Sequence, residues 1–207
     1  MKKVILASTS PRRQAYFKEM GLTFECAAPD VDETPLKDEK PKAYVARVAT
    51  LKALEVKKHN QDAVVVAGDT TVALGRRILG KPENAEDAER MLKLMSGRRH
   101  KVLSAVCVVD ENGQVLQKTT VTTVKVKQLS ESDIQFHLKN AENWQGKAGA
   151  YGIQTTAGGL IVRSIIGSHS GVVGLPLVET KELLVRCGVE FWYCLWVMPV
   201  VSPCSFV

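Results

Sequence analysis

Hydrophobic and polar positions along the chain predict short buried strands separated by helices. The apolar run 4–7 predicts a strand, and the helix after it has Ser10 as N-cap, Pro11 at its first position and Gly21 at its end. The β-branched run 63–67 predicts a second buried strand, which the turn 68–70 terminates. Further strands are expected at 23–28, in the return from 75 to 80 and at 160–166, and further helices over about 41–58, 85–95, 130–139 and 176–187.

A long hairpin is predicted in the middle of the chain. Residues 101–109 and 115–127 alternate apolar and polar positions around Asn112-Gly113, which is a strong hairpin signal. Strand–helix units at both ends, with this hairpin between them, favour an α/β fold: an elongated mixed β-sheet flanked by helices, with two lobes. We expect residues 1–190 to form one domain of two lobes.

The last segment, 191–207, differs from the rest of the chain because it is apolar, rich in aromatic residues and without charge. Its length is at the short end for a membrane span, which needs about 20 apolar residues, and Pro199 and Pro203 interrupt it. We interpret it as an atypical apolar tail, packed or in a terminal strand. A membrane anchor is the alternative.

Composition places the chain among soluble globular proteins. It has 207 residues, of which 45% are hydrophobic and 24% charged. The five cysteines contain no Cys-x-x-Cys pair, which argues against a disulfide framework and a zinc ribbon and favours a reducing, cytoplasmic setting. The first apolar run is too short for a signal peptide.

The net charge of +6 is consistent with an anionic ligand. The basic residues are dispersed, without a stripe or interleaved aromatic residues, so we expect no nucleic acid as a partner.

Two arginines lie where a helix N-terminus disfavours them. The turn Ser10-Pro11-Arg12-Arg13 places both cations in the first turn of the predicted helix, against the helix dipole. An anion in front of the turn would explain them, because free amides and guanidinium groups both bind phosphate. Two solvated surface arginines are the alternative.

Carboxylates occur at two further places. Asp69 follows a buried strand, where open α/β sheets carry active-site groups, although a turn residue is the alternative. Glu33 belongs to an acidic loop that could attract a divalent cation or could simply be solvated. Lys52 and Lys81 could each neutralise phosphate oxygens, and each alone could be a surface residue.

Two glycine-rich segments, 148–154 and 167–176, allow close approach of a ligand to the backbone. Gln154 carries both a donor and an acceptor and could bind a base edge. The spacing fits neither a Walker loop nor a dinucleotide fingerprint, and the scattered histidines disfavour a histidine zinc site.

Together these segments resemble the Maf family of nucleotide pyrophosphatases. The resemblance covers about residues 3–188. Its matching runs are Leu6-Ala7-Ser8-Thr9-Ser10-Pro11-Arg12-Arg13, Asp32-Glu33-Thr34-Pro35, Ala67-Gly68-Asp69-Thr70, Gly80-Lys81-Pro82, Ser96-Gly97-Arg98, residues 148–154 and Gly174-Leu175-Pro176.

The resemblance implies a fold like that of the inosine triphosphate pyrophosphatases, with a ligand cleft between two lobes. It implies hydrolysis of a nucleoside triphosphate to the monophosphate and pyrophosphate (a hydrolase acting on acid anhydrides), with a divalent cation, Mg²⁺ or Mn²⁺. By position, Asp69 is the expected general base or a metal ligand, two roles that compete, and Glu33 is a metal ligand or a second carboxylate. The expected phosphate contacts are Ser8, Arg13, Lys52 and Lys81.

Three positions fall where the family sets substrate preference, namely Arg12, Thr70 and Gln154. This combination is similar to the branch acting on dTTP and UTP, with CTP or modified pyrimidine nucleotides as further candidates. The alternatives are a 7-methyl-GTP pyrophosphatase and a nucleotide-binding regulator of septum formation without catalysis. The expected partner is the nucleotide, with a homodimer as the candidate assembly and no membrane. The tail departs from the family pattern.

Overall fold

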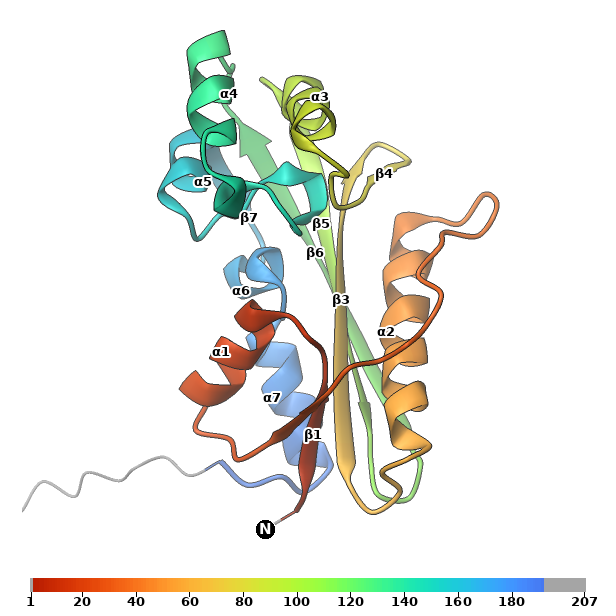
Figure 1. The fold of residues 1–207 in the computed structure, drawn as a ribbon. Helices are drawn as coiled ribbons and strands as arrows, with labels where there is room; N and C mark the ends of the chain where they lie inside the picture. Colours follow the sequence, from red (N-terminus) through yellow and green to blue (C-terminus); the bar gives the residue numbers. More distant parts are fainter. Residues whose placement is uncertain (1, 192–207) are drawn as a thin grey trace, which may run out of the picture.

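A computed structural model describes residues 2–191, and the apolar tail beyond residue 191 lies outside them. The backbone forms a seven-stranded mixed sheet in the order β2-β1-β3-β5-β6-β7, with β4 paired to β3 (Figure 1). The strands are β1 (Val4–Ala7), β2 (Glu25–Ala27), β3 (Val64–Leu74), β4 (Arg77–Leu79), β5 (Arg99–Val109), β6 (Val115–Val126) and β7 (Val162–Ile166).

The sheet is parallel at one end and antiparallel at the other. Strand β1 runs parallel to both β2 and β3, whereas β3, β5, β6 and β7 pair antiparallel in turn. The hairpin of β5 and β6 turns around Gly113, whose φ of 81° suits glycine. The mixed sheet and the hairpin expected from the sequence are therefore confirmed.

Helices cover both faces of the sheet. They are α1 (Pro11–Glu19), α2 (Pro41–Lys57), α3 (Ala85–Met95), α4 (Glu131–Leu138), α5 (Thr156–Ile161), α6 (His169–Val173) and α7 (Leu177–Arg186), with 3₁₀ turns η1 (Ala141–Asn143) and η2 (Ala148–Ala150). Capping side chains mark the N-termini of α3 and α4. Asn84 accepts a hydrogen bond from the Asp87 amide, and Ser130 forms a capping box with Asp133.

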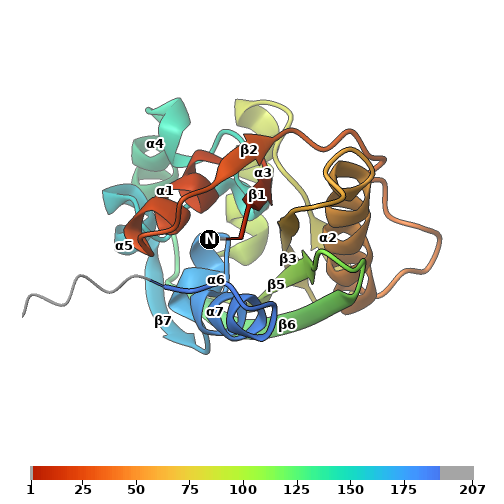
Figure 2. The same ribbon diagram turned by 90° about the horizontal axis from the view of Figure 1, so that it is seen from below.

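Three apolar clusters define two lobes. In the lower lobe, α2 packs on one face of the sheet, and α1 and α7 pack on the other (Figure 2). In the upper lobe, α3 and α4 pack against the continuation of the second face (Figure 1). The long strands β3, β5 and β6 run through both lobes.

One expected boundary is wrong, and it bears on the site. The residues 68–70 do not terminate the second buried strand, because β3 continues to Leu74. Asp69 and Thr70 pair with Ala105 and Ser104 of β5, a partner remote in sequence that local turn chemistry cannot reveal. Asp69 therefore lies within a strand.

The outer edge of β3 is interrupted at the same place. Its parallel pairing with β1 ends at Val66, and its pairing with β4 begins at Val72. Between these two residues β3 has a neighbour only on the β5 side, among the strands that the structure describes.

Two short helices were not expected. Helix α5 follows the first glycine-rich segment and α6 lies within the second. Their N-caps are Thr155 and Ser168, whose side chains accept hydrogen bonds from the Gly158 and Gly171 amides. Among residues 2–191, no helix is both long and apolar enough to cross a membrane.

Two histidines are buried in the upper lobe. His100 is buried and its Nε2 lies 2.8 Å from the Tyr151 hydroxyl, and the Nε2 of His137 lies 3.0 Å from the Ala150 carbonyl oxygen. Burial lowers the pKa of His100 from 6.5 to about 4 and lowers that of His137 as well. Protonation of either ring therefore opposes folding.

Replacing His100 should reduce the acid sensitivity of the fold. Between pH 6.5 and 4 the His100 ring is protonated in the unfolded state and neutral in the folded state. As far as His100 is concerned, the folded protein therefore keeps its full stability above pH 6.5. It loses stability as the pH is lowered, by about 2 kcal/mol at pH 5. Urea unfolding at pH 7.5 and 5.0 should show a smaller difference in His100→Gln than in the wild type. His59→Gln, at an exposed position, is the control, and an equal difference in all three proteins would contradict this assignment.

Candidate active site

A cleft of about 430 Å³ lies between the lobes at the interrupted edge of β3. Its walls come from the β1–α1 turn, the acidic loop, α2, β3, the turn after β4 and both glycine-rich segments. The lining includes all of the site residues expected from the sequence: Ser8, Arg12, Arg13, Glu33, Lys52, Asp69, Thr70, Lys81 and Gln154.

The β1–α1 turn forms one wall of the cleft. Ser10 occupies the N-cap of α1 as expected, but its side chain makes no capping hydrogen bond and the first turn of α1 carries no acidic residue. Its amide instead donates to Ser8 Oγ at 3.1 Å, and Arg13 donates to the same Oγ at 3.4 Å and to the Gly174 carbonyl oxygen at 2.8 Å. Burial lowers the pKa of both Arg12 and Arg13, so an anion in the cleft would favour their charged forms.

A buried lysine joins the two expected carboxylates. Lys52 Nζ lies 2.9 Å from Asp69 Oδ1 and 3.0 Å from Glu33 Oε1, although the three residues come from α2, β3 and the acidic loop. Lys52 and Asp69 are buried, whereas the Glu33 side chain is 43% exposed. In the part of the chain that the structure describes, the second oxygen of Asp69 accepts no hydrogen bond, so it can accept one from a water molecule.

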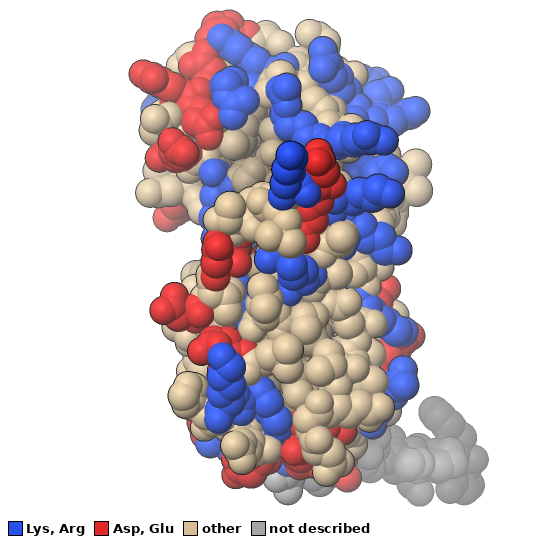
Figure 3. All heavy atoms as spheres, turned by 90° about the vertical axis from the view of Figure 1, so that its right-hand side faces the viewer, with Lys and Arg blue, Asp and Glu red and all other residues tan. Residues whose placement is uncertain are grey.

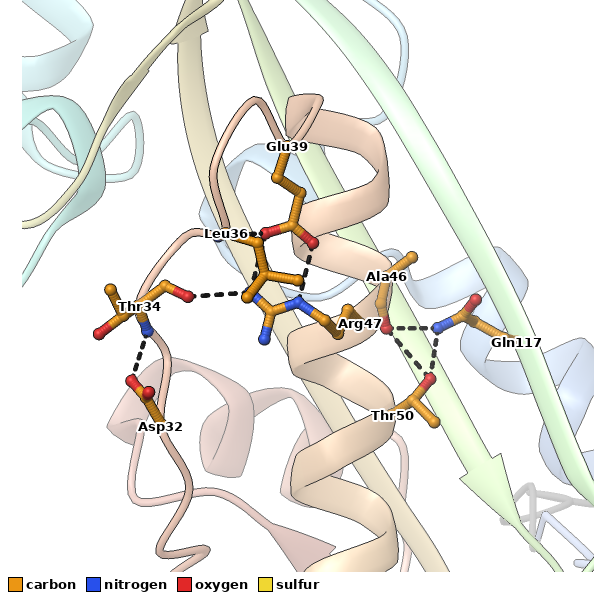
Figure 4. A network of polar contacts seen from close by, with 8 residues as sticks. All are labelled: Asp32, Thr34, Leu36, Glu39, Ala46, Arg47, Thr50 and Gln117. Carbon is orange, nitrogen blue, oxygen red and sulfur yellow. Dashed lines mark hydrogen bonds and ion pairs between the residues drawn. The ribbon is translucent and has the colours of Figure 1, made fainter.

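Arg47 of α2 holds the acidic loop that carries Glu33 (Figure 4). Its guanidinium forms two hydrogen bonds of 2.8 Å to the Glu39 carboxylate and one of 3.0 Å to the Thr34 carbonyl oxygen. The hydrogen bonds from Arg47 lower the pKa of Glu39 to about 2. Asp32 accepts from the Thr34 amide at 2.8 Å, so the backbone on one side of Glu33 is held as well.

The two expected specificity residues Arg12 and Thr70 lie on the α6 side of the cleft. Arg12 donates to the carbonyl oxygens of Val173 at 3.1 Å and Gly146 at 3.4 Å, and so connects α1 to the end of α6 and to the chain just before η2. Thr70 Oγ1 donates to the Gly174 carbonyl oxygen at 3.2 Å and lies 3.0 Å from Ser104 Oγ.

Gln154 and Lys81 line the cleft with exposed side chains. The sequence interpretation did not select Lys147 and Tyr151, which line the cleft, or Ser104, which positions Thr70. Ser104 could have been found as a polar residue inside an apolar run, and Tyr151 as an aromatic residue inside the glycine-rich segment 148–154.

Basic residues also gather outside the cleft. Figure 3 shows Lys and Arg side chains over the upper part of the α2 side of the molecule. Arg77, Arg99 and Lys101 are exposed residues of β4 and β5 in the upper lobe. Their positive potential would favour the approach of an anion.

The donor set suits a small divalent cation. Glu33 and Asp69 both contact the ammonium group of Lys52, so the two carboxylates lie in the same part of the cleft. Mg²⁺ is commonly held in this way, by one or two carboxylates together with phosphate oxygens and waters. Among residues 2–191 no three acidic, histidine or cysteine side chains form a metal cluster, so phosphate oxygens and waters would complete the coordination.

A family model described as Maf-like protein matches residues 3–187 of this chain. The chain belongs to the Maf family. It is 50% identical over 190 residues to the dTTP/UTP pyrophosphatase of Sphingopyxis alaskensis, with 91% of this chain and 98% of that protein covered. It is also 50% identical to the dTTP/UTP pyrophosphatase of Roseobacter denitrificans, with coverage of 89% and 96%.

The fold also resembles that of a solved HAM1 protein from Coxiella burnetii. The two chains share 14% sequence identity and superpose with a TM-score of 0.52, over 92% of this chain and all of that one. This likeness concerns the fold alone, and the expected fold class is thereby confirmed.

A backbone contact in the upper lobe, between Gly158 and Gly152, supports the loop that carries Gln154. A β-carbon on Gly158 would lie 1.9 Å from the Gly152 carbonyl oxygen, which also accepts from the Thr155 hydroxyl at 2.8 Å. Gly158→Ala must therefore displace this loop and should cost about 1–3 kcal/mol of unfolding free energy in urea titrations.

Gly159→Ala is the matched control in the same helix. A β-carbon there meets nothing within 4 Å, so helix propensity should leave stability unchanged or raise it by up to about 1 kcal/mol. Equal stability of the two variants would contradict the proposed backbone contact.

Proposed function

We propose that this protein hydrolyses dTTP and UTP to the nucleoside monophosphate and pyrophosphate, with CTP and modified pyrimidine nucleotides as secondary substrates. The Lys52 bridge between Asp69 and Glu33, beside the β1–α1 turn, carries the proposal. A cation, a carboxylate with a free oxygen and a phosphate-binding turn in one cleft are what attack of water on a phosphate requires. The names of the Sphingopyxis and Roseobacter relatives support the same substrates.

The triphosphate would bind at the lower lobe. Ser8, Arg13 and the first amides of α1 face it from the β1–α1 turn, and Lys52 and Lys81 add positive charge from two other walls. Charge develops on the leaving pyrophosphate as the reaction proceeds, and these fixed donors would stabilise it without reorganising.

The reacting water would be oriented by Asp69. A bond forms between the water oxygen and the α-phosphorus, the bond from that phosphorus to the bridging oxygen of the β-phosphate breaks, and the proton passes to the free oxygen of Asp69. The other oxygen is held by Lys52, which fixes the direction of the carboxylate. Asp69 thus acts as the general base.

Glu33 would hold a divalent cation, Mg²⁺ or Mn²⁺, together with the substrate phosphates. Asp69 is the second predicted ligand, and coordination by its free oxygen would compete with its role as general base. When bound, such a cation neutralises phosphate charge. Arg47 and Glu39 help to keep Glu33 at the cleft, since their contacts hold the segment that follows Glu33 on α2.

The base would bind between Arg12, Thr70 and Gln154. Gln154 offers a donor and an acceptor to the ring edge. Arg12 and Thr70 shape the opposite wall through their hydrogen bonds to the α6 segment. We place the reaction in the cytoplasm, with neither nucleic acid nor membrane as partner, within one domain spanning residues 1–190.

A panel of triphosphates tests the substrate class. With Mg²⁺ present, pyrophosphate release should be fastest with dTTP and UTP and at least about tenfold slower with GTP and 7-methyl-GTP, because the latter are larger purines. A preference for 7-methyl-GTP would overturn the roles of Arg12, Thr70 and Gln154. No release from any nucleotide would favour a regulator that binds nucleotide without catalysis.

Asp69→Asn should lower kcat with UTP by about a thousandfold, because an amide cannot accept the proton. The protein should remain folded in circular dichroism and urea titrations, since Lys52 keeps its contact with Glu33. Asp62→Asn, at an exposed position just before β3, is the control and should retain full activity. Substantial activity in Asp69→Asn would remove Asp69 from the role of general base.

A further inference from the structure

The upper lobe places a buried lysine in the cleft that neither the phosphate contacts nor the attack on phosphorus uses. Lys147 lines the cleft together with Gln154 and Tyr151, and only 9% of it is exposed. Its ammonium donates to the backbone carbonyl oxygen of Glu142. An ammonium group has three donors, so this bond leaves two for a ligand.

Gly152 brings Lys147 and Gln154 together. A β-carbon on Gly152 would lie 2.8 Å from Lys147 Cε and 3.0 Å from Gln154 Nε2. The lysine stem and the Gln154 amide therefore both lie over Gly152, where any other residue would place a side chain. The two polar groups form one subsite.

The charge of Lys147 is not balanced by a carboxylate. Within residues 2–191 it forms no ion pair, and the charges that act on its pKa are those of Arg12, which lowers it, and Glu142, which raises it. Desolvation lowers the pKa of Lys147, and the positive charge of Arg12 lowers it further. A buried cation with only a carbonyl partner is unfavourable unless a ligand supplies another acceptor.

Tyr151 contributes its ring rather than its hydroxyl to the subsite. The hydroxyl lies 2.8 Å from His100 Nε2 and is occupied by that hydrogen bond. Val72 and Val102 also line the cleft. A flat apolar group with polar atoms at its edge, such as a nucleotide base, fits these walls better than a phosphate does.

The two polar groups differ in what they can distinguish. Uracil and thymine carry a carbonyl oxygen at position 4, where cytosine carries an amino group. The Gln154 amide can turn over and match either pattern, so it cannot reject cytosine by itself. Lys147 is only a donor, so it accepts a carbonyl oxygen and leaves an amino group unpaired.

We propose that Lys147 is a specificity-determining residue, which donates a hydrogen bond to the 4-carbonyl oxygen of the bound uracil or thymine and so disfavours cytosine. The inference rests on the proposed function and assigns the part of the base that Lys147 recognises.

Lys147→Met removes the donor and keeps the stem that packs over Gly152. Initial rates of pyrophosphate release would be measured with UTP and CTP in the wild type, in this variant and in Lys139→Met, whose lysine is exposed in the same lobe. We expect the ratio of kcat/KM for UTP to that for CTP to fall about tenfold in Lys147→Met and to stay unchanged in Lys139→Met.

The outcomes separate the two proposals. A wild type that releases pyrophosphate from no nucleotide overturns the proposed function and this inference with it. An active wild type with an unchanged UTP/CTP ratio in Lys147→Met overturns the inference alone. Equal losses with both nucleotides would assign Lys147 to the phosphates and also overturn it.

A test without a variant uses modified substrates, in case Lys147→Met does not fold. Sulfur is a weak hydrogen-bond acceptor, so the wild type should lose more kcat/KM with 4-thio-UTP than with 2-thio-UTP, by about tenfold. Equal rates with the two analogues, or a greater loss at position 2, would contradict the assignment.

Discussion

The interruption in the outer edge of β3 is the constraint on which the rest of the site depends. Successive side chains of a strand point to opposite faces, so Asp69 meets Lys52 of α2 while Thr70 meets the α6 segment. In a sheet with neighbours on both sides, these two side chains would be separated by the sheet. Here β1 has ended and β4 has not begun, so both reach one cleft around an open edge.

Close packing beside this interruption favours glycine at position 68, in the middle of a buried strand. A β-carbon there would lie 3.2 Å from Leu175 Cδ1 and 3.3 Å from Arg13 Nε. The absent side chain lets Arg13 pass over β3 and donate to the Gly174 carbonyl oxygen. One glycine thus allows the β1–α1 turn and the segment before α7 to close on the same stretch of strand.

The sequence predicted best what local chemistry decides. Asn84, Ser130 and Asn112-Gly113 mark their helix starts and hairpin turn through nearby backbone groups, and the structure has them there. The end expected for β3 was wrong because pairing with β5, a strand distant in sequence, extends β3 beyond residue 70. Lys147 was missed for a similar reason: only the folded backbone shows that Gly152 leaves it room beside Gln154.

The cleft is lined by more cationic than anionic side chains. Its lining contains Arg12, Arg13, Lys52, Lys81 and Lys147 against the carboxylates of Glu33 and Asp69. Repulsion among these cations lowers the stability of the free protein, and an anionic ligand that binds only the folded state offsets it. Active sites commonly retain such unfavourable charge because substitutions that relieve it remove function. The cations that oppose the helix dipole at α1 follow from the same requirement.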